Sequence, residues 1–509
     1  MGTPTAARPP TRPSGEHRHR VDPRRVEAGI IAVVAFLVIF ATAPDGMWLD
    51  ETISVRRSGL PLTTLTSFSL GGEPNMALFH YLLWPLGQLH ASDAVFRIVP
   101  VAAGALTLAG TYLLGCRLFD RPTAVIATGF LAVHGLTTRY ATEVRGYSLV
   151  MLLMVWCALL LTDAVRTNRR RSWVLFTVLA VSSFGLHFVA VLFVVAQLAA
   201  LLVVRDSIDR RRALTVAVAI ATGILMLGLV WLVSDQDYWV AWLPELSDEI
   251  VLDVVRALAG GTTIALLVVG VLVLFGSWRS LAALRDPSVP SWPNALVLSA
   301  AWIPILGGAI ASVTHPLSYP RYFLAVLPPI GLLLGRAVMA LPRRPVLPVS
   351  AAAVLLLAVV VGHTDLDRKA REGTNEATAY VTTRIRSGDG IFLPYNEDLS
   401  GFQWYADGAL PDDVVDVRPN VPPDAIHTDW WWEKASRLGP DMPAFASATA
   451  DEWRASLQDV DRVWVVSGFV AKDDRFHDTG SESVPEGRVV CDRQFFAGID
   501  VVLWARSCD

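Results

Sequence analysis

The sequence predicts an α-helical protein that crosses a membrane roughly eleven times and carries a small α/β domain at its C-terminus. Three observations support this prediction. The mean hydropathy is +0.44, and 53% of the 509 residues are hydrophobic while 18% are charged. The charged residues gather in short connections and in the last quarter of the chain. Between the connections recur apolar stretches of about 17–25 residues, the length that spans a hydrocarbon core.

These stretches define a transmembrane domain over residues 26–362. Residues 1–25, rich in Pro, Arg and His, are predicted to be a disordered cytoplasmic N-terminus. No small-residue cleavage site clearly follows the first apolar run, so we expect no cleavable signal peptide. The predicted spans are 26–44, 94–116, 122–138, 146–164, 172–187, 188–204, 213–233, 261–277, 294–313, 322–341 and 346–362.

The arginines of the connections predict the orientation of the chain. Alternate connections are rich in arginine, and the positive-inside rule places those connections in the cytoplasm. An odd number of spans then leaves the N-terminus inside and residues 363–509 outside. We therefore expect a multi-pass protein of the plasma membrane. The arginines expected on the cytoplasmic side are Arg117, Arg121, Arg166, Arg169, Arg170, Arg171, Arg205, Arg210, Arg211, Arg212, Arg279, Arg285, Arg343 and Arg344.

Two adjacent carboxylates, Asp50 and Glu51, lie in the predicted first outer loop, residues 45–93. A carboxylate at the membrane surface can take a proton from a substrate hydroxyl. Taken alone, the pair is more readily explained as a solvated acidic loop. The polar residues at the outer ends of other spans favour a site, because charges at membrane depth are costly and usually face a cavity or a partner. These residues are Arg97, Arg139, Glu143, Arg145, Tyr147, His187, Arg321 and Tyr322.

The last part of the chain, residues 363–509, predicts a small extracytoplasmic α/β domain. Helical spacing over 374–386 precedes a short apolar strand at 391–394, and a second helix at 451–459 precedes a strand at 462–467. Residues 495–505 predict a final strand. Such alternation favours an open sheet covered by helices. A Trp triplet at 430–432 is equally suited to stacking on a sugar, to the membrane interface and to a core.

The four cysteines divide into two pairs. Cys116 and Cys157 lie in predicted spans and are expected to be packing residues. Cys491 and Cys508 both lie in the outer domain, where a disulfide between them is permitted and would fasten the last strand. The spacing alone leaves that disulfide open.

Four segments, in this order, carry a resemblance to a known family. They are Asp50-Glu51; residues 72–83 (GEPNMALFHYLL), with Asn75 where a proline is more usual; Arg97 with residues 139–147 (RYATEVRGY); and residues 320–329 (PRYFLAVLPP). Together they resemble the GT-C membrane glycosyltransferases, in the branch that contains protein O-mannosyltransferases and aminoarabinose transferases. The resemblance covers residues 26 to about 341.

The resemblance implies an inverting transfer of a sugar, of the mannose or arabinofuranose type, from a polyprenyl-phosphate donor to a glycan, lipid or protein acceptor outside the cytoplasm. Asp50 would be the general base and Glu51 would hold the acceptor or tune Asp50. Guanidinium groups suit a departing phosphate, and the candidates are Arg145, Arg321, Arg97 and Arg139. The expected substrate-binding residues are Glu143, Tyr147, His80, His187 and Tyr322.

Each of these residues also has a structural interpretation. Glu143 and Arg145 could form an ion pair that only joins two spans, and Arg97 and Arg321 could be anchors at the water boundary. His187 and His80 could be packing residues at helix ends, and tyrosines are common at membrane interfaces.

The alternatives for the whole protein are a transporter or flippase of a lipid-linked sugar and a non-catalytic scaffold. No inverted repeat or mid-span charged pair favours transport. No His, Cys and Asp cluster has metal-ligand spacing, so we predict no metal and no cofactor, with divalent-metal dependence left open. Nothing in the sequence suggests a nucleic-acid partner.

Overall fold

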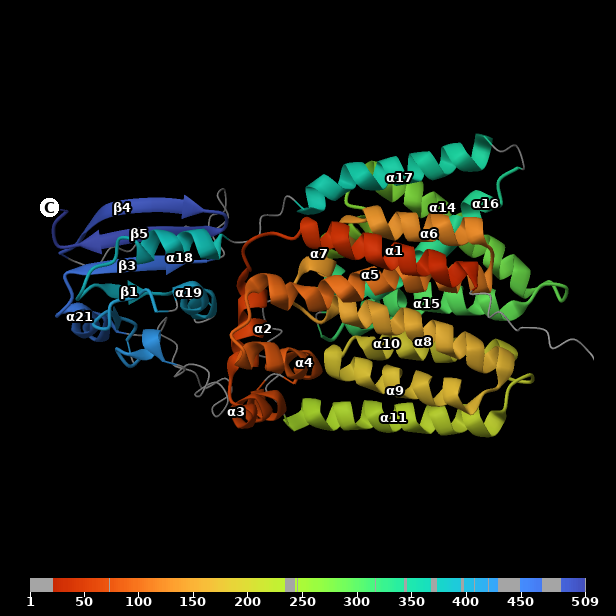
Figure 1. Cartoon of the computed structure of the whole chain (residues 1–509), viewed down its shortest axis with the longest axis horizontal. Coiled ribbons are helices and arrows are strands. Elements are labelled where there is room, and N and C mark those ends of the chain that lie inside the picture. Colours follow the sequence, from red (N-terminus) through yellow and green to blue (C-terminus); the bar gives the residue numbers. More distant parts are fainter. Residues whose placement is uncertain are drawn as a thin grey trace, which may run out of the picture.

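A computed structural model gives the fold of the chain. It describes residues 22–72, 74–233, 243–244, 246–315, 317–342, 346–367, 373–394, 398–406, 408–419, 421–428, 449–468 and 487–508. The protein is a polytopic helical bundle, and a domain built on a β-sheet lies at one end of that bundle (Figure 1). Six of the described helices are long and apolar enough to cross a membrane.

Every expected apolar stretch coincides with helical structure. The bundle consists of α1 (Pro23–Ala41), α5 (Asp93–Leu118), α6 (Arg121–Val133), α7 (Gly135–Thr142), α8 (Tyr147–Thr167), α9 (Arg170–Leu186), α10 (Ala190–Ala199) with a 3₁₀ turn (Ala200–Val204), α11 (Arg210–Val233), α13 (Asp248–Ala259), α14 (Thr263–Leu284), α15 (Ser291–Ala311), a 3₁₀ helix (Pro320–Val326) with α16 (Leu327–Met339), and α17 (Val346–Asp367). Among these, α5, α8 and α16 with its 3₁₀ turn are the most enclosed of the long apolar helices.

The expected span 122–138 is not one continuous helix. α6 ends at Val133 and the separate helix α7 begins at Gly135. His134 between them has an extended backbone, and its ring Nδ1 accepts a hydrogen bond from the backbone N–H of Leu136. This side-chain cap starts a new helix, which carries Arg139 toward the domain end of the bundle.

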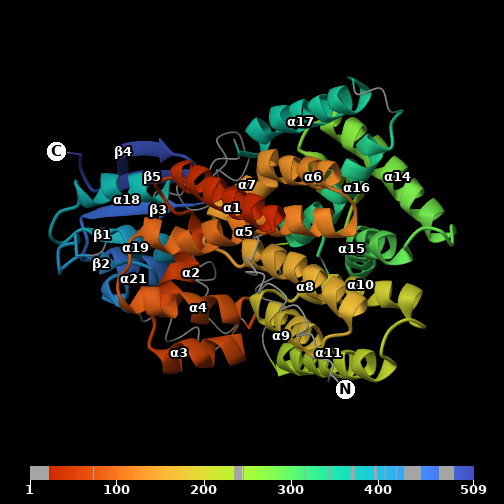
Figure 2. The same ribbon diagram turned by 45° about the vertical axis from the view of Figure 1, so that its right-hand side comes forward.

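Three short helices and a π-helical turn form a layer between the bundle and the sheet domain. They are α2 (Leu49–Gly59), α3 (Leu62–Ser67), the turn Phe68–Gly72 and α4 (Ala77–Gln88). Figure 1 and Figure 2 both place α2 and α4 at the end of the bundle that faces the domain. Residues of α2 pack against α4 and against the domain, so the first loop is an ordered part of the molecule.

The C-terminal domain is a five-stranded sheet with helices, in the strand order β2-β1-β3-β5-β4. β1 (Gly390–Phe392) runs parallel to β2 (Val415–Asp416) and β3 (Arg462–Ser467), while β5 (Ile499–Ala505) is antiparallel to β3 and to β4 (Val489–Phe496). The helices are α18 (Thr374–Thr382), α19 (Asp398–Ala406), a 3₁₀ turn (Ala425–His427) and α21 (Ala450–Leu457). The expected α/β domain is therefore present.

The expected strand 495–505 is wrong in its start. Phe495 and Phe496 end β4, and β5 begins at Ile499 after a tight turn in which Gly498 has φ of 71°. The apolar run continued through this hairpin and concealed the turn, because a glycine can adopt positive φ without interrupting the pattern around it.

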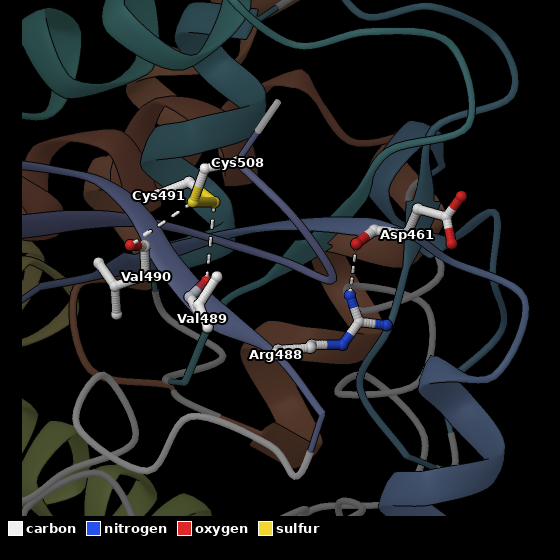
Figure 3. Close-up of a disulfide and its surroundings, with 6 residues drawn as sticks. All are labelled: Asp461, Arg488, Val489, Val490, Cys491 and Cys508. Carbon is white, nitrogen blue, oxygen red and sulfur yellow. Dashed lines mark hydrogen bonds between the residues drawn. A yellow bond between two sulfur atoms is a disulfide. The ribbon is translucent and has the colours of Figure 1, made fainter.

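A disulfide joins Cys491 in β4 to Cys508, three residues after β5 ends (Figure 3). It fastens the C-terminus to the edge of the sheet, as the extracytoplasmic interpretation allowed. Cys116 and Cys157 are free and buried, in accord with a packing role. Trp430, Trp431 and Trp432 lie outside the described residues.

Candidate active site

The candidate site is built on the first turn of α2. Leu49 and Ile53 of this helix are buried in an apolar cluster shared with the C-terminal domain, which fixes one face of α2. Asp50 and Glu51 follow the N-cap residue Trp48, where the positive end of the helix dipole favours negative charge. Two carboxylates therefore lie at the N-terminus of a helix whose backbone is fixed by the packing of Leu49 and Ile53.

Glu51 has no exposed surface and is held by four contacts. Its Oε1 accepts a hydrogen bond from the backbone N–H of Val144 at 2.9 Å and lies 3.1 Å from Nη1 of Arg97. Its Oε2 accepts from Nη2 of Arg97 and from the backbone N–H of Trp48, both at 3.3 Å. Arg97 also donates to the carbonyl oxygens of Thr142 and Gly46. Glu51 therefore joins α2 to α5 and to the segment after α7.

Asp50 points toward two other arginines. Its Oδ2 accepts a hydrogen bond from Nη1 of Arg321 at 2.9 Å and lies 3.9 Å from Nε of Arg145. The Asp50 side chain remains 19% exposed, while those of Arg145 and Arg321 are 9% and 6% exposed. Burial raises the pKa of Asp50, but the charges of Arg145 and Arg321 outweigh that effect and hold it below 3.8. Asp50 is thus an ionised, partly accessible carboxylate between two buried cations.

The connection from α7 to α8 carries two of the predicted residues, Glu143 and Arg145, and they face different partners. Arg145 also donates to Oγ of Ser54 at 3.3 Å, one turn beyond Asp50 on α2. Glu143 is fully buried, and its closest charged partner is Arg139, with Nε and Oε2 3.9 Å apart. Burial and the neighbouring Glu51 raise the pKa of Glu143 to about 7. The alternative interpretation, in which Glu143 and Arg145 form an ion pair that only joins two spans, differs from the contacts described here, because Arg145 turns to α2.

Aromatic rings surround the guanidinium of Arg321. Its Cζ lies 4.9 Å from the ring centroid of Tyr319, 5.5 Å from that of Tyr147 and 5.9 Å from that of Tyr322. The ring of His187, the C-cap of α9, lies 4.9 Å from Tyr322 and 5.3 Å from Tyr147. Tyr147, Tyr322 and His187 are buried, so they are not an exposed interfacial belt. They form an aromatic wall beside Asp50.

His80 on α4 is 1% exposed, and neither of its ring nitrogens has a hydrogen-bond partner among the described residues. Burial, followed by the charges of Arg57 and Arg145, holds its pKa well below the usual range. The imidazole is therefore neutral. A buried polar group without a partner is uncommon, and it is a reason to look for a ligand.

The fold thus brings Asp50, Arg145, Arg321, Tyr147, Tyr322 and His187 into one cluster. It does not direct Arg97 to that cluster: the guanidinium of Arg97 is 2% exposed and is engaged by Glu51 and two carbonyl groups. Arg139 likewise faces Glu143. Within the described parts of the chain, no group of three or more His, Cys, Asp or Glu side chains has a geometry suited to a metal ion.

Sequence reasoning assigned no role in the site to two residues of this region. Arg57, on α2, is 1% exposed and its Cζ lies 4.3 Å from the ring centroid of Phe68. Two adjacent arginines, Arg56 and Arg57, in an expected outer loop were the available signal, since outer loops are usually poor in arginine. Asn75 accepts a hydrogen bond from the backbone N–H of Phe188 at 3.2 Å and so joins the loop to the segment that carries His187. A proline has no side-chain oxygen that could do this.

Fold and site together define a multi-pass membrane protein with an acidic group between buried arginines at one end of its bundle. Residues 74–231 match the family model of the dolichyl-phosphate-mannose-protein mannosyltransferases. No curated protein matches the sequence significantly.

Among solved structures, ArnT from Cupriavidus metallidurans in the apo state is 12% identical and has a TM-score of 0.57, over 95% of this chain and 98% of that one. ArnT from the same organism, bound to undecaprenyl phosphate, is 12% identical and has a TM-score of 0.57, over 94% of this chain and 97% of that one. The oligosaccharyltransferase of Archaeoglobus fulgidus, in complex with Zn and sulfate, is 12% identical and has a TM-score of 0.50, over 88% of this chain and 68% of that one. The chain has the fold of the GT-C membrane glycosyltransferases.

Proposed function

We propose that this protein is a glycosyltransferase that moves a sugar from a polyprenyl-phosphate donor to an acceptor hydroxyl at the extracytoplasmic surface of the plasma membrane. The observation that carries the proposal is the position of the Asp50 carboxylate between Arg145 and Arg321. A carboxylate can accept the proton of the acceptor, and two guanidinium groups can receive a phosphate. The undecaprenyl phosphate bound to ArnT, which shares this fold, supports a lipid phosphate as the ligand.

The reaction follows from these groups. Asp50 takes the proton of the acceptor hydroxyl as the hydroxyl oxygen forms a bond to the anomeric carbon. The bond between that carbon and the phosphate oxygen breaks on the opposite face, which inverts the configuration, and the electron pair leaves with the lipid phosphate. Arg145 and Arg321 stabilise the negative charge that builds on the phosphate. The proton ends on Asp50 and no other reactant is required.

The arginines have a second effect, on the basicity of Asp50. Both guanidinium groups lie beside Asp50, and their charges lower its pKa and make it a weak base. A bound phosphate shares these cations, so that part of their charge is compensated. The pKa of Asp50 then rises, and the base becomes stronger only when the donor is present.

The remaining predicted residues divide into two groups. Tyr147, Tyr322 and His187 form the wall beside Arg321 and are proposed to contact the sugar. His80 is proposed to give its unpaired ring N–H to the donor or acceptor. Glu51, Arg97, Arg139 and Glu143 lie behind this layer and are proposed to hold the backbone that carries Asp50 and Arg145.

The donor is proposed to carry a hexose or a pentose, of the mannose or arabinofuranose type, and the acceptor to be a glycan, a lipid or a protein. The family model over residues 74–231 supports a mannosyl donor among these. The excess of arginine in alternate connections supports a cytoplasmic N-terminus and an extracytoplasmic C-terminal domain in the plasma membrane.

The test is incubation of the purified protein with a panel of polyprenyl-phosphate sugars together with a glycan, a lipid and a peptide that offer acceptor hydroxyls, scored by release of the free lipid phosphate. We expect one donor to be consumed by the wild type. Asp50→Asn should retain donor binding and lose transfer by about 10²–10⁴-fold, because the amide cannot accept the proton. Consumption of no donor, or full turnover by Asp50→Asn, would contradict the proposal.

Glu51→Gln is the matched comparison, since it makes the same chemical change one residue away. Glu51 is fully buried against Arg97, so the loss of its charge should lower the melting temperature of the protein. The Asp50 side chain is 19% exposed, so Asp50→Asn should lower that temperature less than Glu51→Gln does. Comparison of the two variants thus distinguishes a carboxylate that takes part in the reaction from one that holds the structure.

A further inference from the structure

The hydroxyl of Tyr405, on α19 of the C-terminal domain, lies where three parts of the chain meet. It donates a hydrogen bond to Oδ2 of Asp93 at 2.7 Å and accepts one from the backbone N–H of Met47, also at 2.7 Å. The neighbouring Trp404 donates from Nε1 to Oδ1 of Asp93 at 2.9 Å. One aspartate at the start of α5 therefore receives two donors from the C-terminal domain.

Both contacts of Tyr405 lead directly to the candidate base. Met47 comes three residues before Asp50 and is fully buried. Asp93 and Arg97 occupy the first turns of α5, and Arg97 holds Glu51 and the carbonyl oxygen of Gly46. The segment that leads into α2 is thus fastened on one side by Arg97 and on the other by the Tyr405 hydroxyl.

The face of α2 that turns away from the bundle is also covered by the C-terminal domain. Leu49 and Ile53 pack in the same apolar cluster as Phe402 of α19. Nη2 of Arg56 donates to Oε1 of Gln403 at 3.3 Å. Gln403 in turn donates to three carbonyl oxygens of its own domain, those of Ala425, Ile426 and Thr428, so its position is fixed.

We infer that the C-terminal domain positions the catalytic helix, and that Tyr405 is the positioning residue: its hydroxyl fixes the entry to α2 and, with it, the place of Asp50 between Arg145 and Arg321. This inference rests on the proposed function. A domain that served only to bind an acceptor would not need polar contacts to the backbone three residues from the base. Small displacements of a base from its productive geometry are costly to catalysis.

Tyr405→Phe tests the inference, because it removes the hydroxyl and keeps the ring. We expect kcat to fall about 10- to 100-fold while the KM for the polyprenyl-phosphate donor stays within about twofold. The acid limb of the pH profile of kcat should also move, since Asp50 would lose its fixed distance to the arginines. The control is Tyr380→Phe, in the same domain, whose hydroxyl donates to Oδ2 of Asp492 at the same distance of 2.7 Å, within the domain itself. It should leave all these quantities unchanged.

A second measurement does not depend on activity. Amide hydrogen exchange over residues 47–57 should become faster in Tyr405→Phe and in Asp93→Asn, and should not change in Tyr380→Phe. Unchanged exchange together with wild-type kcat in Tyr405→Phe would overturn the inference. Faster exchange in a protein whose wild type consumes no donor would leave α2 positioned by Tyr405 and would reject the proposed function instead. Equal losses in Tyr405→Phe and Tyr380→Phe would reduce Tyr405 to a general stabiliser of the domain.

Discussion

At the scale of single residues, the site depends on how Asp50 shares two cations. The same oxygen, Oδ2, faces both Arg321 and Arg145, and the other oxygen is the one that we propose accepts the proton of the acceptor hydroxyl. Glu51, its neighbour in sequence, is fully enclosed and bonded on both oxygens. Adjacent carboxylates on a helix point about 100° apart, so Asp50 and Glu51 contact different partners.

The shared cations predict a pH dependence that differs between the free and the donor-bound enzyme. In the proposed reaction Asp50 must be ionised, so transfer should fail as the pH falls through the pKa of that carboxyl. The charges of Arg145 and Arg321 hold the pKa of Asp50 below its ordinary value, and the proposed binding of a phosphate by these arginines should raise it. The acid limb of kcat, which reports the donor complex, should therefore lie at higher pH than the acid limb of kcat/KM for the donor.

Arg321→Ala provides the check on this explanation. Without that guanidinium the free carboxyl loses its hydrogen-bonded cation, so the acid limb of kcat/KM should move to higher pH, toward that of kcat. Arg321→Lys should restore the charge but not the planar fork, and should recover part of the separation. If the acid limbs of kcat and of kcat/KM lie at the same pH in the wild type, the donor and the arginines do not act on Asp50 together.

At the scale of elements, close helix contacts hold the bundle that presents the site. A Cβ at Gly276 of α14 would lie 2.3 Å from the carbonyl oxygen of Leu333 in α16. α16 continues from the 3₁₀ helix that carries Arg321, so the packing of α14 supports the site from behind.

Gly276→Ala should destabilise the protein by about 1–3 kcal/mol, because backbone must shift to admit the methyl group. Gly270→Ala in the same helix is the matched control, since a Cβ there meets nothing within 4 Å. That change should be neutral or stabilise α14 by about 0.5–1 kcal/mol through helix propensity. Thermal unfolding in detergent compares the two. Equal melting temperatures of the two variants would mean that α14 and α16 can move apart without a loss of stability.

At the scale of the whole molecule, the short helices of the first loop lie between bundle and sheet domain, and both contribute to holding α2 (Figure 2). The predicted orientation places this end outside the cell. The connection between α8 and α9 lies at the other end of the bundle (Figure 1).

Cysteines introduced at Arg169 and Ala409, both exposed, should therefore label from opposite sides of the membrane, with Ala409→Cys reacting outside. A membrane-impermeable maleimide applied to intact cells measures this. The native cysteines give no background, because Cys116 and Cys157 are buried and Cys491 and Cys508 form a disulfide. Reaction of both positions from one side would reject the topology.

Much of the molecule was predictable from local patterns. Apolar length gave the helices of the bundle, and Asp50, Arg145 and Arg321 stood out because charge at the ends of apolar spans is costly and therefore conspicuous. The break at His134 and the turn at Gly498 were not predictable from hydrophobicity, since both lie inside continuous apolar runs and depend on a cap or a positive φ.

The sequence by itself determined that the chain is a polytopic helical protein with an α/β domain, and it indicated which charged residues were candidates for a site. Only the tertiary structure decided which charges meet: Arg145 and Arg321 turn to Asp50, whereas Arg97 turns to Glu51. It also decided that Tyr405, hundreds of residues away, contacts the segment that leads into α2. The physical reason is that burial and composition act on each segment separately, while ion pairs and hydrogen bonds depend on directions that exist only once all segments are packed.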